Sequence, residues 1–199
     1  MIRRIALASL AALSLTALTA PTLLPVARAA MAAEPATFKI DGVHSTVMFR
    51  IIHMGVSPSY GRFDDVAGTF KLSDSALDLD ITIDVTKIDT DNAKRDEHLK
   101  GPDFFNVQQF PQATFKSKSS TVADGTYSVT GDLSIKGRTK EVTINLKKIG
   151  EGDRGPQMGY RAGFEGHITI NRDDFGVDGF PQALSKEVDL TIALEGSKQ

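Results

Sequence analysis

The chain has 199 residues, with 23 Lys and Arg against 25 Asp and Glu, and a formal net charge of −2 at pH 7. It has neither a basic excess nor a basic run, which argues against a nucleic-acid-binding protein. It contains no Cys, so disulfides and thiol chemistry are excluded and stability has to come from the hydrophobic core.

The N-terminal segment has the pattern of a cleaved secretory signal. Arg3 and Arg4 precede an apolar run from Ile5 to Leu24, and ARA at 27–29 is an A-x-A cleavage site. A transmembrane anchor is the alternative, but two prolines near the end of the run and the cleavage site favour a signal peptide. We therefore expect export to the periplasm, without stable membrane insertion, and the following division of the chain: signal peptide 1–29, linker 30–36 and one domain over 37–199.

The most informative stretch runs from Ala76 to Phe115. It begins with five apolar residues at every second position, which is typical of a half-buried β-strand: Leu77, Leu79, Ile81, Ile83 and Val85. The alternation ends at a polar segment of good helix formers, Asp91 to Lys100, which Gly101 and Pro102 would end. A Phe-rich tail leads into the next strand. The pattern predicts one short helical insert, about 91–107, between two strands.

Elsewhere the chain shows only strands and turns. Asp124-Gly125 between alternating runs is a strong hairpin signal, Ser57-Pro58-Ser59 predicts a break, and Gly150 to Gly155 a loop. Eight substantial strands are expected, at 44–54, 60–72, 77–86, 114–122, 126–135, 138–149, 160–170 and 188–194. Short, regularly spaced strands of this kind indicate a sandwich or an up-and-down barrel, so we predict an all-β fold, an eight-stranded antiparallel barrel.

The interior of such a barrel is either filled by side chains or holds one small ligand. Gly131, Ala162 and Gly166 fall at inward positions, which would leave room, although an inward Gly can equally mark a bend of a strand. Phe104, Phe105 and Phe110 would either plug the end of the barrel as core or cover its mouth as a lid.

The sequence gives little support to catalysis. Ser45 lies next to His44, but neighbours on a strand point to opposite faces and cannot pair directly. There is no G-x-S-x-G motif, and carboxylate pairs such as Asp64 and Asp65 are typical of solvated turns. We therefore predict no catalytic residues and no enzyme.

Metal binding is also poorly supported. His44 and His53 are nine residues apart and would face opposite sides of a regular strand, while His98 and His167 stand alone. No two His have the spacing that brings two imidazoles to one ion. We predict no metal site.

Several segments together resemble the YceI-like polyisoprenoid-binding proteins. They are, in chain order, DGVHSTVMF at 41–49, HMG at 53–55 with GRF at 61–63, RDEHL at 95–99 with DFF at 103–105, FPQATF at 110–115, GDLSIKG at 131–137 and NRDDFG at 171–176. The acidic pair Asp64-Asp65 after Phe63 departs from the family's pattern. The resemblance implies a lipocalin-like, eight-stranded antiparallel barrel that holds an isoprenoid or similar lipid tail, in an exported and often dimeric protein without catalytic residues.

On this reading, inward and large apolar residues would line the ligand cavity. These are Met48, Ile52, Phe70, Leu79, Ile81, Ile83, Phe104, Phe105, Phe110, Tyr127, Val129, Leu133, Ile144, Phe164, Phe175, Leu190 and Ile192. Polar residues at the mouth would meet the head group of the lipid: His44, His53, Arg95, Asp96, His98 and Arg172.

The expected function is that of an exported lipid-binding protein that carries or stores an isoprenoid quinone or polyprenyl-type lipid. No cofactor is expected beyond that lipid, and a homodimer is one expected assembly. The resemblance also suggests a part in the response to stress. Two alternatives stay open, namely an enzyme of isoprenoid-lipid metabolism and an interaction protein whose barrel is filled.

Overall fold

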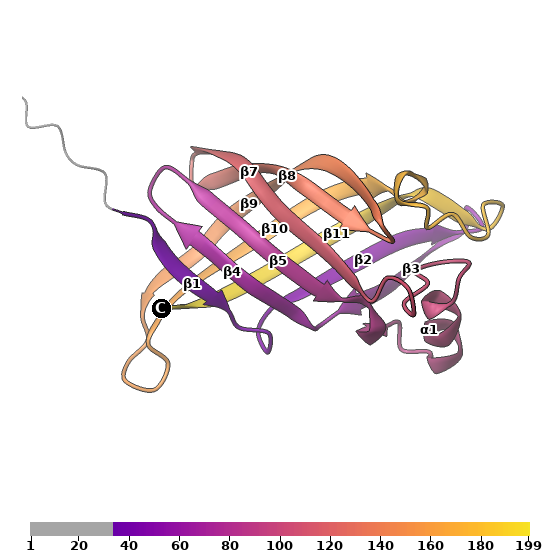
Figure 1. Cartoon of the computed structure of the whole chain (residues 1–199), viewed down its shortest axis with the longest axis horizontal. Helices are drawn as coiled ribbons and strands as arrows, with labels where there is room; N and C mark the ends of the chain where they lie inside the picture. Colours follow the sequence, from indigo (N-terminus) through magenta and orange to yellow (C-terminus); the bar gives the residue numbers. More distant parts are fainter. Residues whose placement is uncertain (1–33) are drawn as a thin grey trace, which may run out of the picture. The chain divides into compact units, whose positions relative to one another are not determined.

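The computed structural model describes residues 34–199, in which the strands form a closed antiparallel barrel with one α-helix near one end (Figure 1). Each strand of the barrel pairs with the next, and the first pairs with the last. In spatial order they are β1 (Ala36–Ile40), β4 (Val66–Leu72), β5 (Leu77–Asp84), β7 (Gln112–Ala123), β8 (Thr126–Ile135), β9 (Arg138–Asp153), β10 (Tyr160–Asn171) and β11 (Leu184–Lys198). The predicted eight-stranded antiparallel barrel is confirmed.

Two further strands lengthen the barrel toward α1. β2 (Thr46–His53) pairs with β11 over residues 184–193, whereas β1 pairs with it only over residues 196–198. β3 (Ser57–Phe63) pairs with β2 in the same way that β4 pairs with β1. β1 and β2 therefore lie one after the other beside β11, at opposite ends of the barrel. β4 lies beside β1 at one end, and β3 lies beside β2 at the other.

The local turn signals are confirmed. Asp124 and Gly125 have φ values of 49° and 73°, as do Lys136 and Gly137, and both pairs join adjacent strands as tight hairpin turns. The helical insert contains α1 (Ala93–Lys100), which begins where the Asn92 side chain accepts a hydrogen bond from the amide of Arg95. The helix ends at Gly101, as predicted, and the rest of the insert is a series of turns.

Several strand boundaries differ from the prediction, and the last strand, predicted at 188–194, is longer at both ends. The strand predicted at 60–72 is two strands. Its first part belongs to β3, which pairs with β2, and after Asp64-Asp65 its second part is β4, which pairs with β1. Pro58 lies inside β3 and does not interrupt the strand, because among residues 34–199 the outer edge of β3 is paired only at Arg62 and Phe63, with β6 (Ile88–Asp89). The loop predicted at 150–155 is wrong, since β9 continues to Asp153 along β10.

Large side chains fill the end of the barrel that lies away from α1. The ring of Phe70 stacks on Phe38 at a centroid distance of 4.7 Å and meets the edge of Phe164 at 5.5 Å, and Phe164 meets Tyr127 at 5.8 Å. All four side chains are almost completely buried. This end of the barrel is a packed core of the kind that side chains can fill without a ligand.

The inward glycines leave no empty space. A Cβ at Gly166 would lie 2.6 Å from Cδ2 of Leu146, and one at Gly131 would lie 2.4 Å from the carbonyl oxygen of Lys116 and 2.8 Å from the ring of Phe115. The expectation that these positions make room for a ligand is therefore wrong. Gly here allows neighbouring side chains and strands to approach closely.

The predicted signal peptide lies outside the described residues. Within residues 34–199, α1 is far too short and too polar to cross a bilayer, and no other helix there could do so.

Candidate functional site

A cavity of about 370 Å³ lies inside the α1 end of the barrel. Most of its wall is apolar and comes from strands on all sides, including Val47, Phe49 and Ile51 of β2, Ile83 of β5 and Leu133 of β8. It reaches the surface beside Tyr60 and Phe180, which border it and are each more than half exposed. Its volume is within the range of about 300–1,000 Å³ that is usual for small-ligand sites.

Six of the predicted lining residues border this cavity: Ile83, Phe104, Phe105, Leu133, Phe175 and Leu190. Phe104 and Phe105 follow α1, and Phe175 ends η2 (Arg172–Phe175), so segments that leave the barrel fold back to close part of its end. That these residues contact a ligand stays a prediction.

Most of the other predicted lining residues belong to the filled end and do not border the cavity. They are Phe70, Leu79, Ile81, Tyr127, Val129, Ile144, Phe164 and Ile192, all buried. The prediction that they line the cavity is wrong, because inward alternation is the same along a strand whether the barrel there is filled or hollow. Phe110 is also outside the cavity wall, half-buried against the Gly137 turn.

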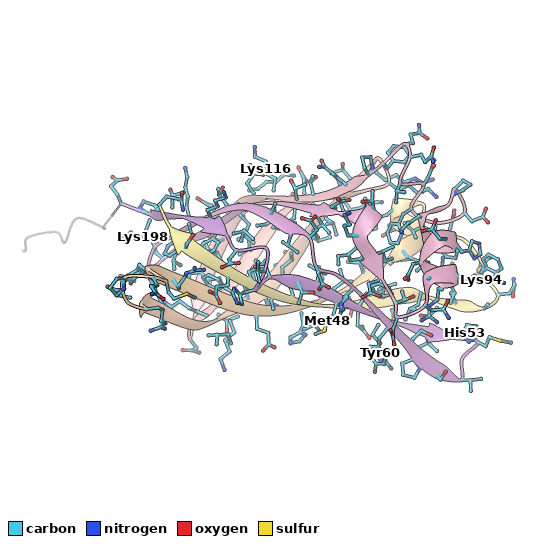
Figure 2. All side chains as sticks on the ribbon, turned by 90° about the horizontal axis from the view of Figure 1, so that it is seen from below. Met48, His53, Tyr60, Lys94, Lys116 and Lys198 are labelled. Atoms are coloured by element: carbon cyan, nitrogen blue, oxygen red, sulfur yellow. The ribbon has the colours of Figure 1, made fainter. Side chains whose placement is uncertain are left out.

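Met48 and Ile52 lie on the outer face of β2, which corrects a second part of the prediction. Met48 is 46% exposed, and Figure 2 shows its side chain outside the barrel. The inward residues are Val47, Phe49 and Ile51, which lie opposite Ile192, Leu190 and Val188 of β11. Both faces of β2 carry apolar residues, so the alternation in this strand gave no signal for the inward face; only the pairing with β11 identifies it.

Arg95 and Asp96 hold α1 against the strand before it. The guanidinium of Arg95 donates to the Thr90 carbonyl and to the Thr90 hydroxyl, at 2.6 Å and 2.8 Å, and Asp96 accepts from the Thr90 amide at 2.9 Å. Arg95 also borders the cavity, whereas Asp96 does not. Of these two predicted mouth residues, Arg95 is therefore at the opening, whereas Asp96 bonds Thr90, which also accepts from Arg95.

Arg172 borders the cavity but is 4% exposed and fully engaged with backbone. Its guanidinium donates to the carbonyls of Val177, Gly179 and Ser185 at 2.6–2.8 Å. These bonds fix the segment between η2 and β11, which forms one side of the cavity opening. Burying a guanidinium is tolerated where its donors are satisfied in this way.

The imidazole of His98 lies between two aromatic rings at the opening. It meets both Phe104 and Phe180 edge-on, at 5.2 Å between centroids, and its Nε2 lies 3.5 Å from Oδ2 of Asp103. We call His98, Phe104 and Phe180 the aromatic rim. The residue that the sequence did not reveal is Phe180, which stands among turn residues without any periodic pattern.

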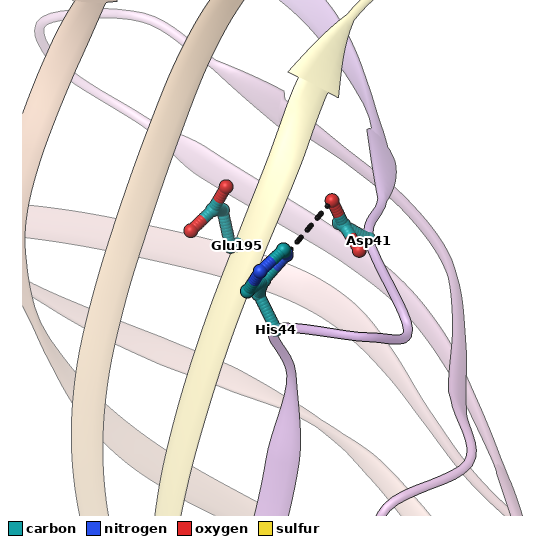
Figure 3. A group of neighbouring side chains, drawn as sticks. All are labelled: Asp41, His44 and Glu195. Carbon is teal, nitrogen blue, oxygen red and sulfur yellow. Dashed lines mark ion pairs between the residues drawn. The ribbon is translucent and has the colours of Figure 1, made fainter. Parts of the chain in front are cut away.

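His53 borders the cavity at the end of β2, on the same side of the molecule as Tyr60 and α1 (Figure 2). His44, the other predicted mouth residue of this region, does not. It lies where β11 changes its partner from β2 to β1, beside Asp41 and Glu195 (Figure 3). The prediction for His44 is wrong. His44 lies in the turn between β1 and β2, and because these strands extend from that turn toward opposite ends of the barrel, the turn lies at neither end.

Asp41 is the centre of this group. Its Oδ2 accepts from the guanidinium of Arg161 at 2.6 Å and lies 3.2 Å from Nδ1 of His44. The hydrogen bonds from Arg161 and His44 lower the pKa of the Asp41 carboxyl from 3.8 to about 2. The same guanidinium nitrogen of Arg161 lies 3.2 Å from Glu195.

Asp41, His44 and Glu195 could offer three ligand atoms to a metal ion, within 4.8 Å of one another. The sequence did not predict this group, since the three residues come together only through the pairing of β11. Arg161 already supplies a positive charge to both carboxylates, and Ser45 bonds the backbone of Glu195. The arrangement is that of a structural ion cluster that holds the strands together.

The chemistry that the cavity offers is the burial of an apolar molecule. The polar groups on its wall are few, and the two guanidinium groups among them already donate to protein oxygens. No pair of titratable side chains among the described residues converges inside it at a distance suited to proton transfer.

Comparison with known proteins agrees with this architecture. Protein YceI of Escherichia coli O157:H7 is 43% identical over 191 residues, which cover 94% of this chain and 98% of that protein. BcnA of Burkholderia cenocepacia superposes with a TM-score of 0.70 at 26% identity, over 78% of this chain and 98% of that one. A polyisoprenoid binding domain from Saccharophagus degradans shares the fold, with a TM-score of 0.62 at 14% identity, over 82% and 99%. Residues 38–196 match the YceI-like domain, so the resemblance is confirmed and the chain belongs to that family.

Proposed function

We propose that this protein binds the apolar chain of an isoprenoid-type lipid in the cavity at the α1 end and carries or stores it after export to the periplasm. The observation that carries the proposal is the apolar cavity that opens beside the aromatic rim while the rest of the barrel is filled. The description of the Saccharophagus degradans domain as polyisoprenoid binding supports this class of lipid.

The energetics of burial favour such a ligand. Each buried CH₂ group contributes roughly 0.8 kcal/mol, so one five-carbon isoprene unit contributes on the order of 3–4 kcal/mol. Association and ordering cost about 4–15 kcal/mol, so a few buried units are enough for tight binding. The polar part of the lipid would remain at the opening, near His53, Tyr60 and Arg95.

The rival functions differ in what they require. An enzyme acting on the same lipid would need reacting groups inside the cavity, whereas Arg95 and Arg172 are engaged in holding α1 and the segment before β11. An interaction protein without ligand would need the whole barrel filled, and the packed cluster of Phe38, Phe70 and Phe164 fills only one end.

Native mass spectrometry of the protein purified without detergent from its own periplasm tests the proposal. We expect a mass adduct that extraction identifies as an isoprenoid quinone or polyprenyl lipid. Protein that carries no adduct should take up added quinone or polyprenol. A chain that carries no lipid and also refuses both added lipids would refute the proposal and favour the interaction protein.

A further inference from the structure

The tip of the β2–β3 hairpin, residues 54–56, presents apolar side chains to solvent beside the cavity opening. Val56 is 85% exposed and Met54 is 65% exposed. Met54 and Gly55 have φ values of 51° and 66°, so a tight turn fixes the tip at the end of two paired strands. The structure thus presents two large apolar side chains to water at the turn of a paired hairpin.

The hairpin tip adjoins residues that border the opening but does not itself line the cavity. The amide of Met54 donates to the carbonyl of Ala183 at 2.6 Å, and His53 pairs with Leu184. Ala183 and Leu184 border the cavity, and so does Phe180 three residues earlier, half exposed on the aromatic rim. Exposed apolar side chains therefore stand both on the hairpin tip and on the aromatic rim, beside the apolar interior of the cavity.

The hairpin carries no formal charge near its tip. Residues 51–61 contain no Asp, Glu, Lys or Arg, in a chain of which 24% of residues are charged. On the neighbouring side of the cavity, α1 carries Lys94, Arg95 and Lys100 against Asp96 and Glu97, which is nearly balanced. The uncharged apolar tip fits the interface of a zwitterionic bilayer, and Tyr60 behind it, hydrogen-bonded to the Arg50 guanidinium, is an aromatic residue with one polar end, a type favoured at that interface.

A protein partner fits this surface less well. Within the described part of the chain, the outer edge of β3 is unpaired over residues 57–61 and could accept a further strand, but Pro58 lacks the amide that such pairing uses. An apolar lipid, by contrast, has to leave a bilayer without crossing water, and an opening bordered by exposed apolar side chains lowers that barrier when it lies against the bilayer.

The geometry points to a membrane-docking surface made of Met54, Val56, Tyr60 and Phe180, which places the cavity opening against a zwitterionic lipid bilayer. The side chains of the hairpin tip enter the interfacial layer, and the lipid passes between bilayer and cavity beside Phe180. This inference rests on the proposed lipid-binding function and adds where the lipid enters.

The test is co-sedimentation of the full mature chain with phosphatidylcholine vesicles. We expect Val56→Asp to lower the partition coefficient about tenfold, and the double variant Met54→Asp, Val56→Asp to lower it further. Val43→Asp is the matched control, because Val43 is also an exposed Val, 88% exposed, but lies in the turn between β1 and β2. Its partition coefficient should stay within twofold of that of the wild type.

Uptake of a short-chain quinone added from solution is measured on the same proteins as a mass adduct, and it should be equal in all of them. If the wild type takes up no lipid, the proposed lipid-binding function is refuted. The vesicle assay still tests membrane docking in that case, because it does not depend on lipid uptake. Equal partitioning of Val56→Asp and wild type overturns the docking surface. Partitioning that requires an anionic lipid would also overturn the docking surface. The same holds if the wild type is a dimer and Val56→Asp dissociates it without changing the partition coefficient.

Discussion

The rings of Phe104 and Phe180 lie parallel, with their centroids 5.9 Å apart and their planes 1° apart, although one follows α1 and the other precedes β11. Phe104 is buried and Phe180 is half exposed. The two segments that close the cavity opening are therefore joined through an aromatic contact of which one partner, Phe180, borders solvent.

Removal of this contact should speed the release of ligand. We expect Phe180→Ala to raise the rate at which bound quinone is lost at least threefold. The reason is that the stacking of Phe104 and Phe180, which holds the two segments together over the opening, is removed. The cost in unfolding free energy should be about 1 kcal/mol or less, since aromatic pairs contribute about 0.5–1.5 kcal/mol and Phe180 is half exposed. A time course of adduct loss in native mass spectrometry measures the rate. An unchanged rate would mean that the aromatic rim does not control release.

A charge placed on the cavity wall should abolish lipid uptake. Leu133→Arg puts a guanidinium into the apolar cavity, whereas Met48→Arg puts the same group on the outer face of β2 as a matched control. Since Leu133→Arg could also disturb folding, Ala113→Phe provides a second variant that fills the cavity with an apolar ring. Circular dichroism and lipid content are measured for all three. Normal lipid content in folded Leu133→Arg and Ala113→Phe would place the ligand elsewhere.

The filled end of the barrel should dominate stability. Phe70 contacts the rings of both Phe38 and Phe164 and is 1% exposed. We expect Phe70→Ala to lower the free energy of unfolding by about 3–5 kcal/mol, as is usual for a buried Phe. Met48→Ala, at an exposed apolar position, should change it by about 0.5 kcal/mol or less. Urea unfolding gives both values, and equal values would contradict a packed core at this end.

The ion cluster at the partner change of β11 should make stability depend on pH in the acid range. The pKa of Asp41 is about 2 in the folded protein against 3.8 ordinarily, so its stabilisation is complete above about pH 4 and is lost as the pH falls toward 2. Asp41→Asn should therefore cost about 1–2 kcal/mol at pH 7, since its partners donate to a charged group that is partly exposed. The difference between Asn and wild type should shrink between pH 4 and pH 2 in urea unfolding. Asp124→Asn, in a hairpin turn, should show no such trend, and a constant difference for Asp41→Asn would exclude its charge as the cause.

The strands and hairpins could be predicted from the sequence because their signals are local. Alternation in residues 77–85 and the Asp124-Gly125 turn depend only on neighbours along the chain, and both are found in the structure. Pairing with distant strands carries no such signal. For that reason the division of the 60–72 segment, the extension of β9 and the two partners of β11 could not be predicted.

The candidate site was predicted only in part for a related reason. Alternation identifies the inward face of a strand, but the filled and the hollow ends of the barrel have the same pattern, as Phe70 and Ile83 illustrate. Where both faces are apolar, as in β2, even the inward face is ambiguous, and Met48 was placed on the wrong side. Phe180 lies in a turn segment and gives no periodic signal at all.

The change of partner along β11 has a consequence for the dynamics of the protein. β1 and β4 complete the barrel at the filled end, whereas β2 and β3 complete it at the cavity end. Among residues 34–199 the outer edge of β3 is paired only at Arg62 and Phe63, so β3 can open locally while β2 stays paired with β11 and every pair between β1 and its neighbours persists. Amide hydrogens in β3 should therefore exchange with solvent through partial opening, and those of β1 and β4 only through global unfolding.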